Sequence, residues 1–319
     1  MKKLALLLAA LSVASVSYAK EVMPEAAPVV EEAPVVEQEV VEVKAAPVLR
    51  VTSVGQELVV EDTSSQGTKN DANIGEAVHL KNMVGLALGD SWTFDLMARK
   101  TWEASTDDAH TDGEKWDGMR SAGHRIDLQA TRHFENFSLG LRWRGEKNKD
   151  AIFLPVSYNY GMVSGWFDPA YYFVNESKGQ DYFYLEAEPV VLSYGPVQLA
   201  YYFEGYKWTG EGDGNAPTDT KSDYAHQARL RGTVYSNDAF SVGLEYRYQF
   251  AQDVEMVNGN KDVENNRHIG VLSGSYNVTE NLTLAGYYQY EFNKYEQHEG
   301  DVMDDDYYGE FGLGWTYNF

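Results

Sequence analysis

The stretch GEFGLGWTYNF, residues Gly309 to Phe319, shows the clearest structural pattern in the chain. Apolar or aromatic residues occupy positions 311, 313, 315, 317 and 319, and Gly, Thr or Asn fills the positions between them. A period of two is the side-chain period of a β-strand. The stretch therefore predicts a strand with one apolar face and one small or polar face. A last aromatic residue at position 319 suits a strand that lies in lipid and ends at the membrane–water boundary.

This ending resembles the C-terminal signature strand of bacterial outer-membrane β-barrels. The resemblance implies a location in the outer membrane, with lipid around the apolar face of the strand. It also implies that the barrel-assembly machinery recognises the strand as a partner. The predicted assembly signal consists of Trp315, Tyr317 and Phe319.

The first residues have the pattern of a secretory signal peptide. A basic start at Met1-Lys2-Lys3 precedes an apolar run from Leu4 to Val16, and Ser17-Tyr18-Ala19 offers small residues for cleavage after Ala19. The apolar run is too short for a transmembrane helix, so residues 1–19 are predicted to be removed on export.

Residues 20–49 form a second, compositionally distinct segment. Four prolines interrupt it, and Val-Val-Glu units lie between them. Such a composition predicts an extended linker with no core of its own. Two interpretations stay open: a simple spacer in the periplasm, or a tether to the cell wall or to a partner there.

The amino-acid composition limits the classes of protein to which the chain can belong. The chain holds 23 Tyr, 13 Phe, 7 Trp and 28 Gly and no Cys, so disulfides are not expected to stabilise it. Its formal charge is −23, and it becomes −25 once Lys2 and Lys3 leave with the signal peptide. A nucleic-acid partner is not expected, because phosphate contacts require basic surface.

From residue 50 to residue 319 the sequence alternates as a series of strands. About fourteen are predicted, with twelve or sixteen as alternatives, and the weakest patterns are the first, sixth and seventh. Their ranges are 50–61, 76–89, 92–103, 121–134, 137–146, 151–161, 166–175, 181–193, 196–208, 223–236, 239–252, 265–278, 281–295 and 305–319. The fold class is therefore all-β, an antiparallel transmembrane β-barrel.

The connections between these strands alternate in length. Short ones such as 89–91, 237–238 and 279–280 contrast with long, acidic ones such as 104–120 and 209–222. Outer-membrane barrels have short periplasmic turns and longer extracellular loops. An even number of strands then places both termini in the periplasm. The alternative is a soluble sandwich or lipocalin-like barrel, whose apolar face would point inward.

If the apolar face is outside, the intervening charged residues line the lumen. So many charges would not fill a dry core, because their desolvation would exceed what pairing returns, so the lumen is predicted to hold water. Two roles stay open: basic and acidic walls that face each other and select solutes, or ion pairs that brace the wall. The predicted pore-lining residues are Arg99, Arg125, Arg142, Arg144, Arg229, Arg231, Arg247, Glu186, Glu188, Glu204, Glu245, Glu291 and Glu310.

No catalytic residue, metal site or cofactor is predicted. The sequence has neither a His-Glu-x-x-His nor a Gly-x-Ser-x-Gly motif, and Asp108 with His110 is an expected coincidence in a polar loop. The acidic loops lack the spacing of a calcium-binding loop, so solvated charge explains them better.

The start of the chain resembles one porin family in particular. Met1-Lys2-Lys3-Leu4-Ala5-Leu6, the stretch Ala19-Lys20-Glu21-Val22-Met23-Pro24 and the Pro/Val/Glu linker are similar to the fusobacterial major outer-membrane porins, the FomA-like proteins. The resemblance implies a fourteen-stranded porin for passive diffusion of small hydrophilic solutes and ions. It also implies an alternative, a surface adhesin whose acidic loops bind a host or bacterial partner while the barrel serves as an anchor.

Overall fold

A computed structural model describes residues 47–64, 72–104, 119–175, 180–210, 220–257, 259, 261–262, 264–296 and 306–319. The predicted signal peptide and nearly all of the predicted linker lie outside these residues, as do most of the long loops. Among the described residues, no helix has the length and apolar character needed to span a membrane.

Within these residues the chain forms a closed antiparallel barrel of fourteen strands. In ring order they are β1 (Leu49–Ser64), β2 (Ala72–Leu88), β3 (Trp92–Ala104), β4 (Met119–His133), β5 (Phe137–Glu146), β6 (Lys149–Phe153) with β7 (Val156–Tyr160), β8 (Val163–Val174), β9 (Tyr182–Tyr194), β10 (Val197–Trp208), β11 (Thr220–Ser236), β12 (Phe240–Met256), β14 (Glu264–Asn277), β15 (Leu282–Glu296) and β16 (Asp306–Asn318). The short β13 (Lys261–Asp262) pairs with the end of β12. The predicted fold class and strand number are confirmed.

The sixth wall strand differs from its prediction because it is interrupted. It was expected to run unbroken over 151–161, but β6 and β7 are separated by Leu154 and Pro155. Proline has no N–H to donate to a sheet ladder, so it breaks a strand. Gly140 N–H donates to Pro155 O at 2.7 Å, and Leu154 N–H donates to Pro169 O at 2.9 Å. These bonds hold the two halves in one wall position.

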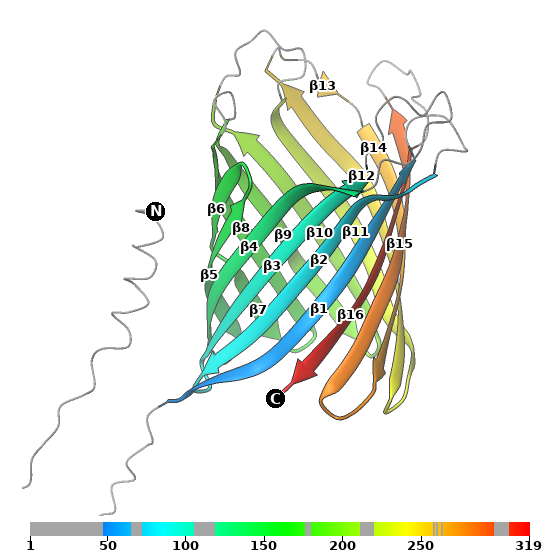
Figure 1. The fold of residues 1–319 in the computed structure, drawn as a ribbon. Helices are drawn as coiled ribbons and strands as arrows, with labels where there is room; N and C mark the ends of the chain where they lie inside the picture. The colour runs from blue at the N-terminus through cyan, green and yellow to red at the C-terminus, as the bar shows by residue number, and fades with distance from the viewer. Residues whose placement is uncertain are drawn as a thin grey trace, which may run out of the picture. The chain divides into compact units, whose positions relative to one another are not determined.

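The closing strand pairs with the first strand, as its pattern requires. Figure 1 shows β1 and β16 side by side, and their register runs from Ser53 opposite Asn318 to Ser64 opposite Tyr307. Phe319 N–H donates to Thr52 O at 3.0 Å. This pairing removes the last free edge of the sheet, as a closed barrel requires.

The rim at which β1 begins and β16 ends carries tight turns. Gly89, Gly161 and Gly195 have φ of 58°, 71° and 58°, a region that glycine enters without steric cost and that tight hairpins use. Figure 1 shows the short turns at this rim. By the strand bounds these connections span two to four residues, whereas the connections between the other ends of the strands span seven or more, except for 147–148. The predicted alternation of connection length is therefore present in the barrel.

The two faces of the sheet differ sharply in polarity. On one face large apolar side chains stand exposed on strand after strand, for example Leu199 and Leu230 at 51%, Leu272 at 51% and Leu313 at 53%. The other face carries the charged residues described below. A soluble barrel would bury the apolar face, so this arrangement contradicts the soluble alternative.

Candidate functional site

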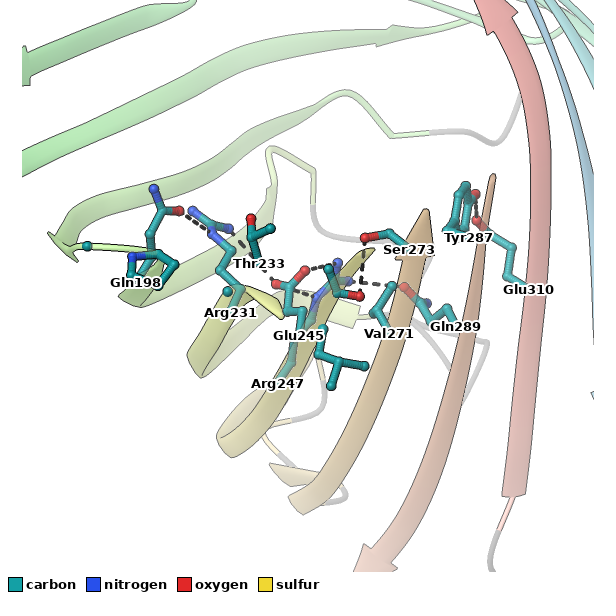
Figure 2. A pocket seen from close by; sticks show the side chains of 15 residues that line it. Gln198, Arg231, Thr233, Glu245, Arg247, Val271, Ser273, Tyr287, Gln289 and Glu310 are labelled. Carbon is teal, nitrogen blue, oxygen red and sulfur yellow. Dashed lines mark hydrogen bonds and ion pairs between the residues drawn. The ribbon is translucent and has the colours of Figure 1, made fainter. Parts of the chain in front are cut away.

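The charged face is the concave, interior face of the barrel. Arg229 on β11 reaches Glu188 on β9 across the intervening β10, and Arg247 on β12 reaches Gln289 on β15 across β14. Side chains converge on the inside of a cylinder and diverge on its outside, so contacts across a whole strand indicate the interior. Figure 2 shows such residues directed into one cavity.

One group of basic side chains surrounds Asp127 on β4. Arg125 Nη2 lies 2.5 Å from Asp127 Oδ2, and Arg144 Nε lies 3.0 Å from Asp127 Oδ1. On the next part of the wall, Arg142 pairs with Asp168 of β8. Three of the predicted pore-lining arginines are thus neutralised by two aspartates.

A second group of basic side chains surrounds Glu188, whose exposed fraction is only 2%. Arg229 Nη1 and Arg231 Nη2 lie 3.1 Å and 2.7 Å from its two carboxylate oxygens. Beside this group, Arg247 Nε donates to Glu245 Oε1 at 2.9 Å. The bracing interpretation therefore describes most of the arginines: they are held to carboxylates along the wall.

Arg99 on β3 is different from the other arginines. It lies directly opposite Arg125 across the β3–β4 pair, and its Nε is buried without a hydrogen-bond partner. Within the described residues no ion pair involves Arg99. Among the described residues it is the one predicted pore-lining arginine without an ion pair.

Two acidic groups are bound by tyrosines instead of by arginines. Glu186 and Glu204 lie directly opposite each other on β9 and β10. Tyr202 O–H donates to Glu186 Oε1 at 3.0 Å, and Tyr206 O–H donates to Glu204 Oε1 at 2.7 Å. The Tyr184 hydroxyl oxygen lies 2.8 Å from Glu186 Oε2 and 3.2 Å from Glu204 Oε1, so its one hydrogen can serve either carboxylate. Neither glutamate has an ion pair within the described part of the chain.

The second acidic group lies near the closing seam. Tyr287 and Tyr308 both donate to Glu310, the latter at 2.8 Å. Glu291, by contrast, lies 3.5 Å from Arg267 Nε and accepts from Gln289 Nε2 at 2.6 Å. Among the described residues, Glu310 is therefore bound by tyrosines alone, whereas Glu291 has a cation beside it.

An aromatic lining on the same inner face was missed by the sequence analysis. Phe153, Tyr172 and Tyr182 are buried there, and Tyr172 and Tyr182 stack with their centroids 4.5 Å apart. The guanidinium groups of Arg142 and Arg144 lie 4.0 Å and 4.6 Å from the Phe153 ring centroid. Such contacts between a cation and a ring face are attractive. The aromatic side chains therefore pack beneath the first basic group and fix its position.

The order of charged groups around the ring differs in part from the expectation of basic walls facing acidic ones. Half-way round the ring of fourteen strands from β4, which carries Arg125, is β12, which carries Arg247. Half-way round from β9, which carries Glu186, is β1, which carries Glu57 and Glu61. By this count the strand of Arg125 faces that of Arg247 and the strand of Glu186 faces one that carries acidic residues, whereas β10 with Glu204 faces β2, which carries Lys81.

The predicted assembly residues lie on the outer face of β16 and just beyond it. Trp315 and Tyr317 are each 38% exposed, and Phe319 is 67% exposed. The rings of Tyr317 and Phe319 meet edge to face with centroids 5.0 Å apart. They form an exposed aromatic edge beside the rim where the chain ends.

The comparisons with known proteins establish no family. No protein-family model matches the chain, and no curated protein matches it. Among solved structures, the chain is similar to OmpT, an outer membrane protein of Vibrio cholerae, with 12% identity, coverage of 85% of this chain and 98% of that one, and a TM-score of 0.45. It is also similar to an anion-selective porin from Comamonas acidovorans, with 13% identity, coverage of 85% and 100%, and a TM-score of 0.43.

A bacterial polysaccharide outer membrane secretin matches with 10% identity, coverage of 83% of this chain and 98% of that one, and a TM-score of 0.48. Because the identities are this low and the TM-scores fall below 0.5, no activity of these proteins is carried over to this chain.

Within the described ranges, no group of three or more His, Asp or Glu side chains is arranged to hold a metal ion. The acidic loop residues, and Asp108 with His110, lie outside those ranges. The site is therefore the lumen itself: a polar wall of paired charges, tyrosine-bound carboxylates and buried aromatic rings.

Proposed function

We propose that the barrel is an outer-membrane porin, a passive channel for small hydrophilic solutes and ions, and not an enzyme. The observation that carries the proposal is the reversed polarity of a closed sheet, with exposed leucines outside and paired charges inside. An apolar exterior suits lipid, and closure satisfies the backbone hydrogen bonds that lipid would leave unmade.

The charged interior favours a water-filled lumen over a dry core. Ion pairs such as Arg144–Asp127 and Arg247–Glu245 leave part of each guanidinium without a partner, and Glu186 and Glu204 lie directly opposite each other with no ion pair to the residues that the structure describes. Moving these groups into a dry interior would cost several kcal/mol for each ion, whereas water solvates them. Small polar solutes can use the same hydrated path.

The proposed location follows from the same arrangement. In an outer membrane the rim of short turns would face the periplasm, and both ends of the barrel would lie there. Exposed Trp315, Tyr317 and Phe319 would then be available to the barrel-assembly machinery before insertion. Membership of the FomA-like porins stays a prediction from the first residues of the chain. The adhesin alternative depends on loops outside the described residues.

A liposome-swelling assay tests the proposal. Purified, folded protein in vesicles should admit small sugars such as arabinose faster than larger ones such as sucrose or raffinose, because a channel of fixed width sieves solutes by size. Heat-unfolded protein added to the same vesicles is the control. Vesicles whose permeability is unchanged by folded protein would exclude a passive channel.

A further inference from the structure

One part of the lumen forms a defined cavity with charges of both signs. It has a volume of about 690 Å³ and is lined by residues of β10, β11, β12, β14, β15 and β16. Its charged side chains are Arg231, Glu245, Arg247 and Glu310, so two cations and two anions share one polar recess. Figure 2 shows Arg231 and Arg247 toward one side and Glu310 with Tyr287 toward the other.

The two arginines have hydrogen-bonding capacity to spare. Arg247 donates through Nε and Nη2 to Glu245 and through Nη1 to Gln289, at 2.9 Å, 3.1 Å and 3.2 Å. Arg231 donates once to Gln198 and twice to Glu188. A guanidinium has five N–H groups, so two on each arginine are left for another acceptor. A carboxylate is an acceptor that guanidinium groups bind strongly, often through two parallel hydrogen bonds.

Glu310 supplies the opposite charge without a cation beside it. Its oxygens accept hydrogen bonds from the hydroxyls of Tyr287 and Tyr308, and no ion pair within the described residues includes it. Its direct neighbours across the two adjoining strands are Gln289 and Glu61. The Glu310 side of the cavity is therefore negative, and tyrosine hydroxyls hold the carboxylate in position.

One residue, Gln289, lies between the two charged sides of the cavity. Gln289 accepts a hydrogen bond from Arg247 and stands directly opposite Glu310 in the β15–β16 pair. Directly opposed residues on antiparallel strands have Cβ atoms about 5 Å apart. Arg247 and Glu310 therefore lie on opposite sides of Gln289, and a solute that carries a carboxylate and an ammonium group on one carbon can turn the first toward Arg247 and the second toward Glu310.

We propose that this cavity is a binding site for zwitterionic solutes of the α-amino-acid type. The carboxylate accepts from the free N–H groups of Arg247 and Arg231, and the ammonium donates to Glu310. The site rests on the proposed channel function, because the solute reaches the cavity through the lumen. It would concentrate zwitterions in the channel relative to neutral solutes of the same size.

Block of single-channel current in a planar bilayer tests the site. L-alanine should reduce or interrupt the KCl current at a lower concentration than lactamide, a neutral molecule of similar size. Propionate and alanine methyl ester, which carry only one of the two charges, should be weaker than alanine. A carbohydrate site would instead respond to arabinose more strongly than to alanine, which would overturn the proposal.

Single substitutions assign the two charges. Glu310→Gln and Arg247→Gln should each raise the half-blocking concentration of alanine by about tenfold, the loss expected for one charge-assisted contact. Glu204→Gln and Arg99→Gln make the same changes of charge in the lumen but lie outside the cavity, and should leave that concentration unchanged. The open-channel current in KCl checks that each variant has folded.

An equal effect of the cavity and control substitutions would overturn the site. So would a wild-type channel that alanine blocks no better than lactamide. In either case the KCl current persists, so failure of the site is distinguishable from failure of the channel function, in which no current appears.

Discussion

At Glu188, two guanidinium groups converge on one buried carboxylate. Such a cluster stabilises the folded protein only while every member is present, because removing one member leaves the others charged and unpaired in a poorly hydrated place. Among the described residues, the one further ion pair of these two arginines is with Glu245, at 3.9 Å from Arg231. The cluster is therefore a point at which a single substitution should matter.

Glu188→Gln should lower the free energy of unfolding by about 3–5 kcal/mol, the usual cost of breaking a buried ion pair. Urea titration of the protein in detergent micelles, followed by tryptophan fluorescence, measures the change. Glu280→Gln, at an exposed turn, is the matched control and should stay within about 0.5 kcal/mol of the wild type. If both variants unfold at the wild-type urea concentration, the Glu188 cluster contributes nothing to stability.

Arg99 offers the opposite case, a charge that can be removed without leaving a carboxylate unpaired. Its only direct cross-strand basic neighbours, Arg125 and Lys81, repel it, and the described residues give it no ion pair. Arg99→Gln should therefore fold normally and shift the reversal potential in a KCl gradient toward cation preference. Lys207→Gln, an exposed position on β10, is the control. A reversal potential that moves equally in both variants would contradict a lumen position for the Arg99 charge.

At the scale of the strands, the sequence pattern predicts elements well where the two faces differ in polarity. β12 alternates cleanly between Leu, Tyr and Phe outside and Glu, Arg and Gln inside, and its predicted start is one residue from the observed one. β8 and the paired β6 and β7 were the weakest patterns besides the first strand. On β8, Tyr172 faces the inside of the barrel while Tyr171 and Phe173 face the outside. Because aromatic residues lie on both faces, the strand lacks a clear alternation of apolar and polar residues.

The seam between β15 and β16 depends on a glycine. A Cβ built at Gly312 would overlap the ring of Tyr287, whose hydroxyl is bound to Glu310. Gly312→Val should therefore displace that ring and lower the free energy of unfolding by about 1–3 kcal/mol, the usual cost of overpacking.

Gly270→Val is the control, because a Cβ at Gly270 would meet nothing within 4 Å. The midpoint of heat-induced loss of the folded band on a gel compares the two variants. A midpoint that falls as much for Gly270→Val as for Gly312→Val would show that the contact with Tyr287 is not the cause.

Across the barrel, the sequence pattern predicts a charged interior, but it does not predict which charged side chains contact each other. The alternation of polar and apolar residues along each strand is enough to predict that Arg229 and Glu188 face the lumen, because each lies between apolar residues. Their contact joins strands that are not neighbours, and it depends on register and curvature that no local pattern contains. The same holds for which strands face each other across the ring, because that depends on the number of strands.

As a porin, this closed barrel would enclose a continuous, water-filled path between its two rims. The conductance of single channels in a planar bilayer tests whether that path exists. Folded protein added at low concentration should give discrete, long-lived current steps that are linear with voltage near zero and grow in proportion to KCl concentration. Protein that inserts as a folded barrel, resistant to added protease, yet gives no current steps would contradict the claim.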